Sequence, residues 1–199
     1  MNIRAVIFDF GGVIERTLDP EPRVGLATRV GLTREELEQA VFDTETARHA
    51  ALGQVSPDDL WDSICDNLQL ARAERREVER AFWGGDQLNT ELLDFIRSLR
   101  PQYKTALLSN AWLDLRPLIT DVLKIADAFD AIIISSEVGV MKPDPPIYGH
   151  VLQELGVAPN EAVFVDDALR NVEGARAIGM HAIQFKETGQ VIAELKQLL

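Results

Sequence analysis

Two sets of carboxylate groups directly follow short apolar runs that read as buried strands. Asp9 comes after the run 3–8, and the pair Asp166-Asp167 comes after the run 163–165. Because chemistry in open α/β sheets gathers at the carboxyl ends of the strands, we expect these side chains to converge. Adjacent carboxylates repel each other unless a cation lies between them, and hard oxygen ligands favour Mg²⁺. The pattern predicts a magnesium site beside a carboxylate nucleophile.

Three further groups could bind a phosphate beside that nucleophile. Gly11 and Gly12 allow backbone N–H groups to approach a phosphate closely. Ser109-Asn110 follows the apolar run 105–108 and offers a hydroxyl with adjacent backbone donors. Lys142 lies in a proline-rich loop and could neutralise both the nucleophile and the phosphate. Taken alone, each is also compatible with an ordinary turn, a helix cap or a surface lysine; together they suit hydrolysis of a phosphate monoester through an aspartyl phosphate.

The elements that must position these residues alternate along the chain. Apolar runs rich in β-branched residues occupy 5–8, 105–108, 131–134, 162–165 and 181–185, and helical patterns occupy 90–99, 115–125, 146–155, 169–178 and 191–198. Strands that are apolar on both faces are typical of a parallel sheet covered by helices on both sides. We therefore predict an α/β fold, a Rossmann-like three-layer sandwich with a parallel central sheet.

Residues 18–85 interrupt this alternation with amphipathic helical segments and no convincing strand. Helix starts are indicated by Thr33 with Glu36 and by Ser56 before Pro57. We predict a small all-helical cap domain at 18–85, inserted after the first strand of a core domain formed by 1–17 and 86–199. The charges between 71 and 82 are interpreted as a solvated helix face.

Composition narrows the range of partners and locations. The 199 residues carry a formal net charge of −12, which argues against nucleic acid and anionic membrane surfaces as partners. The single cysteine excludes an intrachain disulfide, and neither a signal segment nor a long apolar span is apparent. We expect a cytoplasmic protein, and the sequence leaves its state open between monomer and homodimer.

In this order along the chain, the motifs resemble those of the haloacid dehalogenase-like hydrolase superfamily. The resemblance covers residues 3–17 and 104–180, and the insert lies where that superfamily carries a helical cap. It is strongest to the branch of sugar phosphatases and epoxide hydrolase N-terminal domains. The motifs that carry it are Asp9-Phe10-Gly11-Gly12-Val13, Ser109-Asn110, Lys142-Pro143-Asp144-Pro145 and Asp166-Asp167 through Asn171.

The resemblance implies a set of metal ligands. Asp9 would be both the nucleophile and a Mg²⁺ ligand, and the backbone carbonyl of Gly11 would be a second ligand. Asp167 would bind the metal directly, and Asp166 would assist directly or through water. Asn171 would support these ligands from behind.

The resemblance also implies a phosphate site. Ser109 and Lys142 would bind the phosphate, Gly12 would contact it through its backbone, and Asn110 would orient the site. The expected function is a Mg²⁺-dependent phosphatase that hydrolyses a small phosphorylated metabolite through an aspartyl-phosphate intermediate.

Position 11 departs from the pattern of the superfamily. Most of its phosphatases carry there a second Asp that protonates the leaving group, whereas this chain has Gly11. Glu15 or His49 could supply the proton, or the enzyme could prefer good leaving groups. A non-catalytic binding protein of the same fold stays an alternative. So does a metal-independent 2-haloacid dehalogenase, although that reaction gives no reason for the pair Asp166-Asp167.

Aromatic residues of the insert offer a further expectation. Phe42, Trp61 and Trp83 have helical spacing and are interpreted as the core of the insert rather than as substrate contacts. Trp112, which lies just after Ser109-Asn110, is the better candidate for the wall of a substrate pocket.

Overall fold

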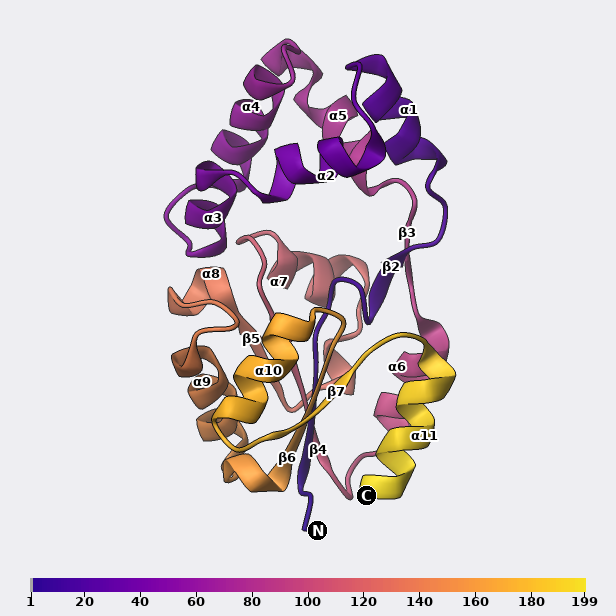
Figure 1. Ribbon diagram of the computed structural model, residues 1–199, viewed down its shortest axis with the longest axis vertical. Coiled ribbons are helices and arrows are strands. Elements are labelled where there is room, and N and C mark those ends of the chain that lie inside the picture. Colours follow the sequence, from indigo (N-terminus) through magenta and orange to yellow (C-terminus); the bar gives the residue numbers. More distant parts are fainter. Residues whose placement is uncertain (1) are drawn as a thin grey trace.

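The computed structural model describes residues 2–199. Its central sheet contains five parallel strands in the order β5-β4-β1-β6-β7 (Figure 1). The strands are β1 Ala5–Phe8, β4 Lys104–Ser109, β5 Ala131–Ile134, β6 Ala162–Asp166 and β7 His181–Gln184. The predicted strands and their parallel arrangement are confirmed.

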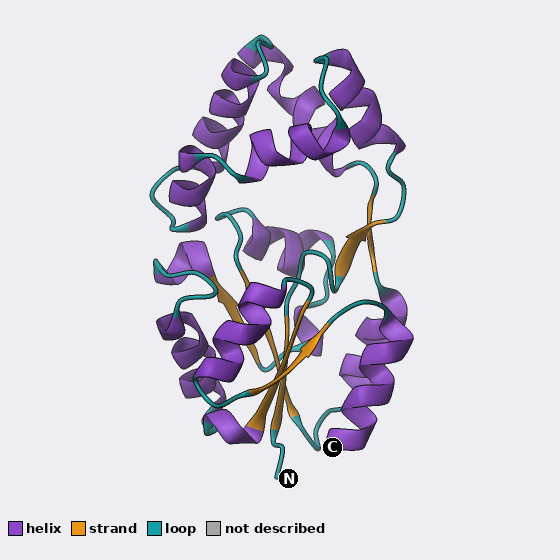
Figure 2. Cartoon of the chain, in the orientation of Figure 1, coloured by secondary structure: helices purple, strands orange, loops and turns teal. Residues whose placement is uncertain are grey.

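Helices cover both faces of this sheet (Figure 2). They are α6 Thr90–Ser98, α7 Leu115–Pro117, α8 Ser135–Val138, α9 Pro145–Leu155, α10 Leu169–Ala177 and α11 Thr188–Leu198. Alternate residues of β1 point to opposite faces: Val6 and Phe8 pack in one apolar cluster with α6 and α11, whereas Ala5 and Ile7 pack in another with α9 and α10. The three-layer α/β fold is thus confirmed.

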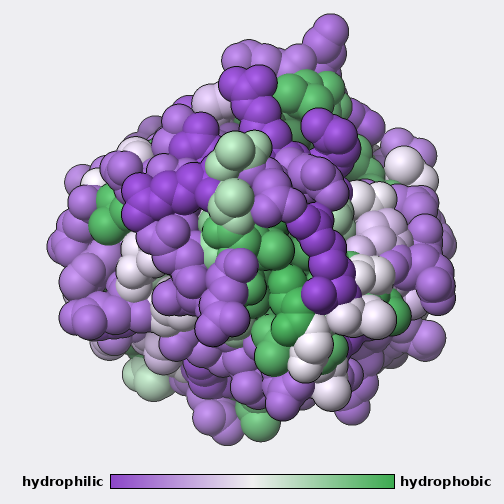
Figure 3. Space-filling view, turned by 90° about the horizontal axis from the view of Figure 1, so that it is seen from above, coloured by the Kyte–Doolittle hydropathy of each residue, from purple (hydrophilic) through white to green (hydrophobic). Residues whose placement is uncertain are grey.

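The helical segment lies above the carboxyl ends of the sheet strands (Figure 1). Its helices are α1 Glu21–Arg29, α2 Arg34–Phe42, α3 Glu45–Ala51, α4 Pro57–Asn67 and α5 Arg75–Trp83. They bury an apolar cluster of their own, and their outer surface is largely hydrophilic with one hydrophobic strip (Figure 3). The predicted capping box of Thr33 and Glu36 and the Ser56 cap are present. The extents 18–85 and 1–17 with 86–199 remain our proposal for two domains.

Two short strands that the sequence analysis did not predict connect the helical segment to the core. β2 Glu15–Thr17 and β3 Asp86–Leu88 pair antiparallel. Arg23 of α1 is buried beside them, where its guanidinium lies 2.9 Å from the Asp86 carboxylate and donates to the backbone carbonyl of Phe82. A buried arginine is tolerated when its donors are satisfied. This network therefore fixes the orientation of α1 and α5 relative to the two-stranded ribbon of β2 and β3.

The helix predicted at 115–125 is wrong in its extent. The structure has only a short turn at α7 and then one π-helical turn at Leu118–Val122. The helix stops before the predicted residue 125 because Lys124 has a φ angle of +53°, a left-handed conformation that a right-handed helix cannot include. No helix among residues 2–199 is long and apolar enough to cross a membrane.

A close contact between Gly53 and Ser136 joins the helical segment to the core at α8. A Cβ atom on Gly53 would lie 2.0 Å from the Ser136 carbonyl oxygen, and the φ angle of Gly53 is +74°. Gly53→Ala should therefore lower the free energy of unfolding by about 2–4 kcal/mol, measured by urea denaturation. Gly25→Ala, in α1 with open space around it, should instead raise it by about 0.5–1 kcal/mol. Equal stability of Gly53→Ala and the wild type would contradict the contact.

Candidate active site

The carboxylates predicted to converge do so at the carboxyl edge of the sheet. Asp9 follows β1, and its backbone N–H donates to Val165 of the neighbouring strand β6 at 2.9 Å. Asp9, Asp166 and Asp167 each place a carboxylate oxygen within 4.8 Å of those of the other two. Asp9 and Asp166 are buried, and Asp167 is exposed. Strand order alone accounts for this convergence, because β1 and β6 are adjacent and parallel.

Lys142 supplies the positive charge at this centre. Its side chain is fully buried, and its Nζ lies 2.8 Å from Asp9 and 2.7 Å from Asp166. Burial alone would lower the pKa of Lys142, but the charges of the two carboxylates outweigh it and raise that pKa above its usual value. The ammonium therefore stays charged.

One ammonium does not balance three carboxylates. Burial raises the pKa of Asp9 to about 8; Lys142 opposes this rise, while Asp166 and Asp167 add to it. Asn171 places a buried Oδ1 here that accepts no hydrogen bond from residues 2–199. A cluster of hard oxygen donors with excess negative charge suits a divalent cation such as Mg²⁺. The donor set therefore fits the predicted metal.

Two asparagines hold the charged groups in register. Asn110 binds the backbone of Lys142 on both sides: its Nδ2 donates to the carbonyl at 2.8 Å, and its Oδ1 accepts from the N–H at 2.7 Å. The Nδ2 of Asn171 donates to both carboxylate oxygens of Asp166 at 3.1 Å. Tyr148 in turn donates to the backbone carbonyl of Asn171 at 2.7 Å. Such contacts set the orientation of the ligating groups.

Ser109 and the two glycines lie at the same edge of the sheet. Ser109 ends β4 and is buried. Gly12 has a φ angle of +80°, and a Cβ there would lie 2.5 Å from the Asp167 carboxylate, so only glycine fits. Gly11 has open space around it, which leaves room for a ligand beside its backbone.

Within residues 2–199, no hydrogen bond or ion pair links either predicted proton source to Asp9. The charged neighbours of Glu15 are Asp86 and Arg23 at the connecting ribbon; burial raises the pKa of Glu15 to about 7, Asp86 adds to the rise, and Arg23 opposes it. His49 is half-buried in α3, and its side chain forms no hydrogen bond or ion pair within residues 2–199.

Five aromatic rings gather between the helical segment and the core. Phe42, Trp61, Phe82 and Trp83 come from the insert and pack with Trp112 of the core loop after Ser109-Asn110, with ring centroids 4.8–6.3 Å apart. Trp61 and Phe82 are buried, as predicted for core residues, whereas Phe42 is 45% exposed. Trp112 is 8% exposed, so most of its ring packs within this cluster and little of it is available to line a substrate pocket.

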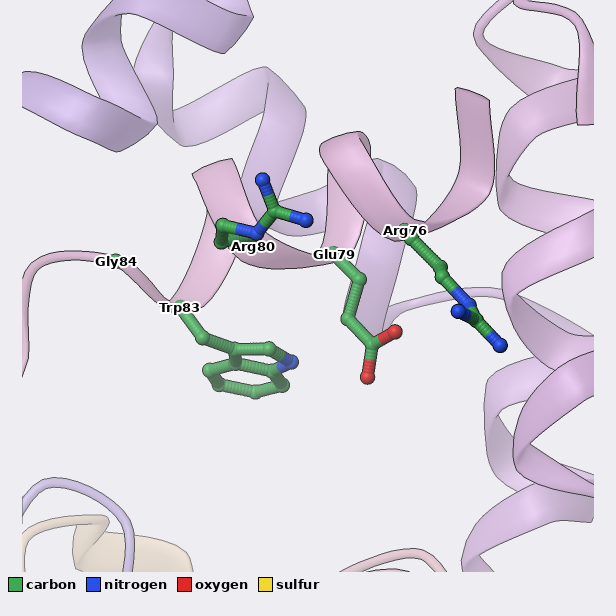
Figure 4. Close-up of a pocket in the computed structure, with 5 residues that line it drawn as sticks. All are labelled: Arg76, Glu79, Arg80, Trp83 and Gly84. Carbon is green, nitrogen blue, oxygen red and sulfur yellow. The ribbon is translucent and has the colours of Figure 1, made fainter. Parts of the chain in front are cut away.

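A pocket of about 490 Å³ lies against α5 and includes Trp83 of this cluster in its lining (Figure 4). Its lining residues are Arg76, Glu79, Arg80, Trp83 and Gly84. From the sequence we interpreted these charges as a solvated helix face, and we did not predict the pocket. The signal that could have indicated it is the spacing of Arg76, Glu79 and Trp83, at i, i+3 and i+7, which places these three side chains on one side of the helix.

Comparison with known proteins agrees with this arrangement. Over 199 residues the chain is 28% identical to the sesquiterpene phosphatase astK of Aspergillus oryzae, covering 100% of this chain and 97% of that one. It is 26% identical to the D-ribitol-5-phosphate phosphatase of Bacteroides thetaiotaomicron, covering 92% and 91%. The crystal structure of a HAD family enzyme from Bacteroides thetaiotaomicron, solved as a magnesium complex, superposes with a TM-score of 0.78 at 23% identity, covering 94% of each chain.

A family model provides the assignment. Residues 3–179 match the model described as haloacid dehalogenase-like hydrolase. The match includes both carboxylate motifs, Lys142 and the helical segment, and it confirms the resemblance seen in the sequence. The chain belongs to the haloacid dehalogenase-like hydrolases.

Proposed function

We propose that the protein is a Mg²⁺-dependent phosphatase that hydrolyses a small phosphorylated metabolite through an aspartyl phosphate. The single observation that carries the proposal is the cluster of Asp9, Asp166 and Asp167 with Lys142 bridging the two buried carboxylates. The named phosphatase activities of the two relatives support the same reaction class.

In the proposed reaction, Asp9 attacks phosphorus and forms the aspartyl phosphate while the bond to the leaving oxygen breaks. The ammonium of Lys142 and the hydroxyl of Ser109 bind the phosphoryl oxygens, with the backbone N–H of Gly12 at the turn. Asn110 keeps Lys142 in place by its two backbone hydrogen bonds. Water then cleaves the acyl phosphate and regenerates Asp9.

Asp9, Asp166, Asp167 and the Gly11 carbonyl would hold Mg²⁺, with Asn171 behind them. When bound, the ion neutralises phosphoryl charge and allows two negative groups to meet. No side chain at position 11 can protonate the leaving group. We therefore propose that the enzyme favours esters whose leaving groups need little help from an acid.

Hydrolysis of para-nitrophenyl phosphate tests the proposal, because its leaving group needs no acid. We expect turnover with Mg²⁺ and loss of nearly all turnover in excess EDTA, restored when Mg²⁺ is added back. Absence of turnover with Mg²⁺ would contradict the phosphatase. Release of chloride from 2-chloropropionate in EDTA would instead support the dehalogenase alternative.

A further inference from the structure

The pocket on α5 combines an aromatic ring with charged side chains on one side of the helix. The opposite face of α5 is used for packing, since Val78 and Phe82 are buried in the core of the insert. Arg75 and Glu77 are also occupied, by ion pairs with α4 and α1 respectively. The side that lines the pocket is left free to meet a ligand.

This pocket adjoins the loop that leads away from the proposed phosphate site. Trp83 packs against Trp112 with ring centroids 6.0 Å apart. Among charged neighbours, Asp114 has the largest effect on the pKa of Glu79. Burial raises this pKa, and the negative charge of Asp114 adds to the rise. Residues 112–114 follow Ser109 by only a few positions, so one short loop connects the proposed phosphate site to the surroundings of this pocket.

Trp83 forms a fixed aromatic surface in this pocket. Its ring is half-exposed, and its partners hold it from several sides: Phe82 at 4.8 Å, Phe42 at 5.9 Å and Trp61 at 6.3 Å between centroids. Rings held in edge-to-face contacts lose little freedom on binding. A flat apolar group could stack there at small entropic cost.

Arg76 adds a positive charge beside that surface. Figure 4 shows the side chains of Trp83, Glu79 and Arg76 pointing to the same side of α5, while Arg80 extends across the other side. Arg76 is exposed and forms no ion pair within residues 2–199, in a chain with a net charge of −12. Its charge lowers the pKa of Glu79 in the same pocket, but the two side chains form no ion pair. The guanidinium can therefore bind a carboxylate or phosphate through two parallel hydrogen bonds.

We propose that this pocket binds the leaving group of the substrate, and that this group combines a flat apolar body with an anionic substituent. The apolar body stacks on Trp83, and the substituent, a carboxylate or a second phosphate, pairs with Arg76. This assignment rests on the proposed phosphatase function and specifies its substrate class. An uncharged polyhydroxylated leaving group would use neither feature.

Four phosphate esters test the assignment in the presence of Mg²⁺: phenyl phosphate, 4-carboxyphenyl phosphate, 1,4-phenylene bisphosphate and glycerol 3-phosphate. In the wild type, we expect the two esters with a second anion to have kcat/KM about fivefold above phenyl phosphate, and glycerol 3-phosphate to be the poorest. The better of the two anionic esters identifies the substituent.

Variants assign these preferences to residues. Trp83→Ala should lower kcat/KM about tenfold for all three aryl esters and leave glycerol 3-phosphate unchanged, and Trp83→Phe should recover part of the loss. Arg76→Gln should remove the preference for a second anion and leave phenyl phosphate unchanged. Arg72→Gln, an exposed arginine of the same segment outside the pocket, should behave as wild type. Unchanged preferences in Trp83→Ala and Arg76→Gln would overturn the assignment.

Binding without turnover separates this inference from the proposed function. All three tryptophans of the chain lie in the aromatic cluster, so 4-carboxyphenylphosphonate should quench the intrinsic fluorescence with saturation. The affinity should fall about fivefold in Arg76→Gln. Inactivity toward every ester would contradict the phosphatase alone, whereas absence of saturable quenching would overturn the pocket assignment.

Discussion

Replacing Asp9 by Asn should reduce Mg²⁺-dependent hydrolysis of para-nitrophenyl phosphate by about 10⁴-fold or more, because an amide cannot form the acyl phosphate. The change is nearly isosteric, and an Asn Oδ1 can still accept the hydrogen bond that the Phe10 N–H donates to Asp9 at 2.7 Å. The loss should therefore appear in kcat and not in folding. A steady-state assay with a single-turnover control measures it.

The pH dependence of the stability of Asp9→Asn tests the protonation of Asp9 independently of its role in catalysis. In EDTA, burial raises the pKa of Asp9 to about 8, so the folded wild type holds a proton more tightly than the unfolded chain does. Its stability should fall as pH rises from about 4 to about 8, and Asp9→Asn should lack this part of the slope. A variant that keeps wild-type turnover would exclude Asp9 as the nucleophile.

Replacing Lys142 by Met should lower the free energy of unfolding in EDTA by about 3–5 kcal/mol, the usual cost of removing one partner from a buried ion pair. Both Asp9 and Asp166 lose their cationic neighbour at 2.8 and 2.7 Å. Hydrolysis should fall to background as well, since the ammonium is proposed to bind the phosphoryl group. Urea denaturation and the phosphatase assay measure the two effects.

Magnesium provides an internal control for Lys142→Met. A divalent cation among the same carboxylates should restore part of the lost stability, so the variant should gain more from Mg²⁺ than the wild type does. Lys196→Met, an exposed lysine of α11, should stay within about 0.5 kcal/mol of wild type under both conditions. A Lys142→Met protein as stable as wild type in EDTA would refute the buried bridge.

The convergence of the site could be predicted because it depends on local patterns. Each of the runs before Asp9, Ser109 and Asp166 is apolar on both faces, which identifies buried parallel strands, and their carboxyl ends must meet at one edge. The roles of these residues remain proposals, although the burial of Lys142 between Asp9 and Asp166 agrees with the charge expected of it.

What the sequence could not reveal depends on packing between distant segments. Arg23 and Asp86 lie 63 positions apart, and nothing local pairs them. The ribbon of β2 and β3 has three residues in each strand, too few for a periodic signal. Likewise, the charges on α5 have the same helical spacing whether they face water or a pocket, and the contact between Trp83 and Trp112, which are 29 positions apart, has no local signal.

The strand order also determines when the site can form during folding. β1 pairs with β4 and β6, so Ala5 has its register partners at Lys104 and Ala162, which lie 99 and 157 positions away. Contacts of such high sequence separation slow folding, because the chain loses the entropy of closing long loops before the strand pairing contributes any stability. On the ribosome, Asp9 is made 157 residues before Asp166 and gains that neighbour only after the whole intervening segment has been made. The nascent chain thus carries an apolar β1 without both of its neighbours until β6 has been made, which exposes this strand to aggregation in the meantime.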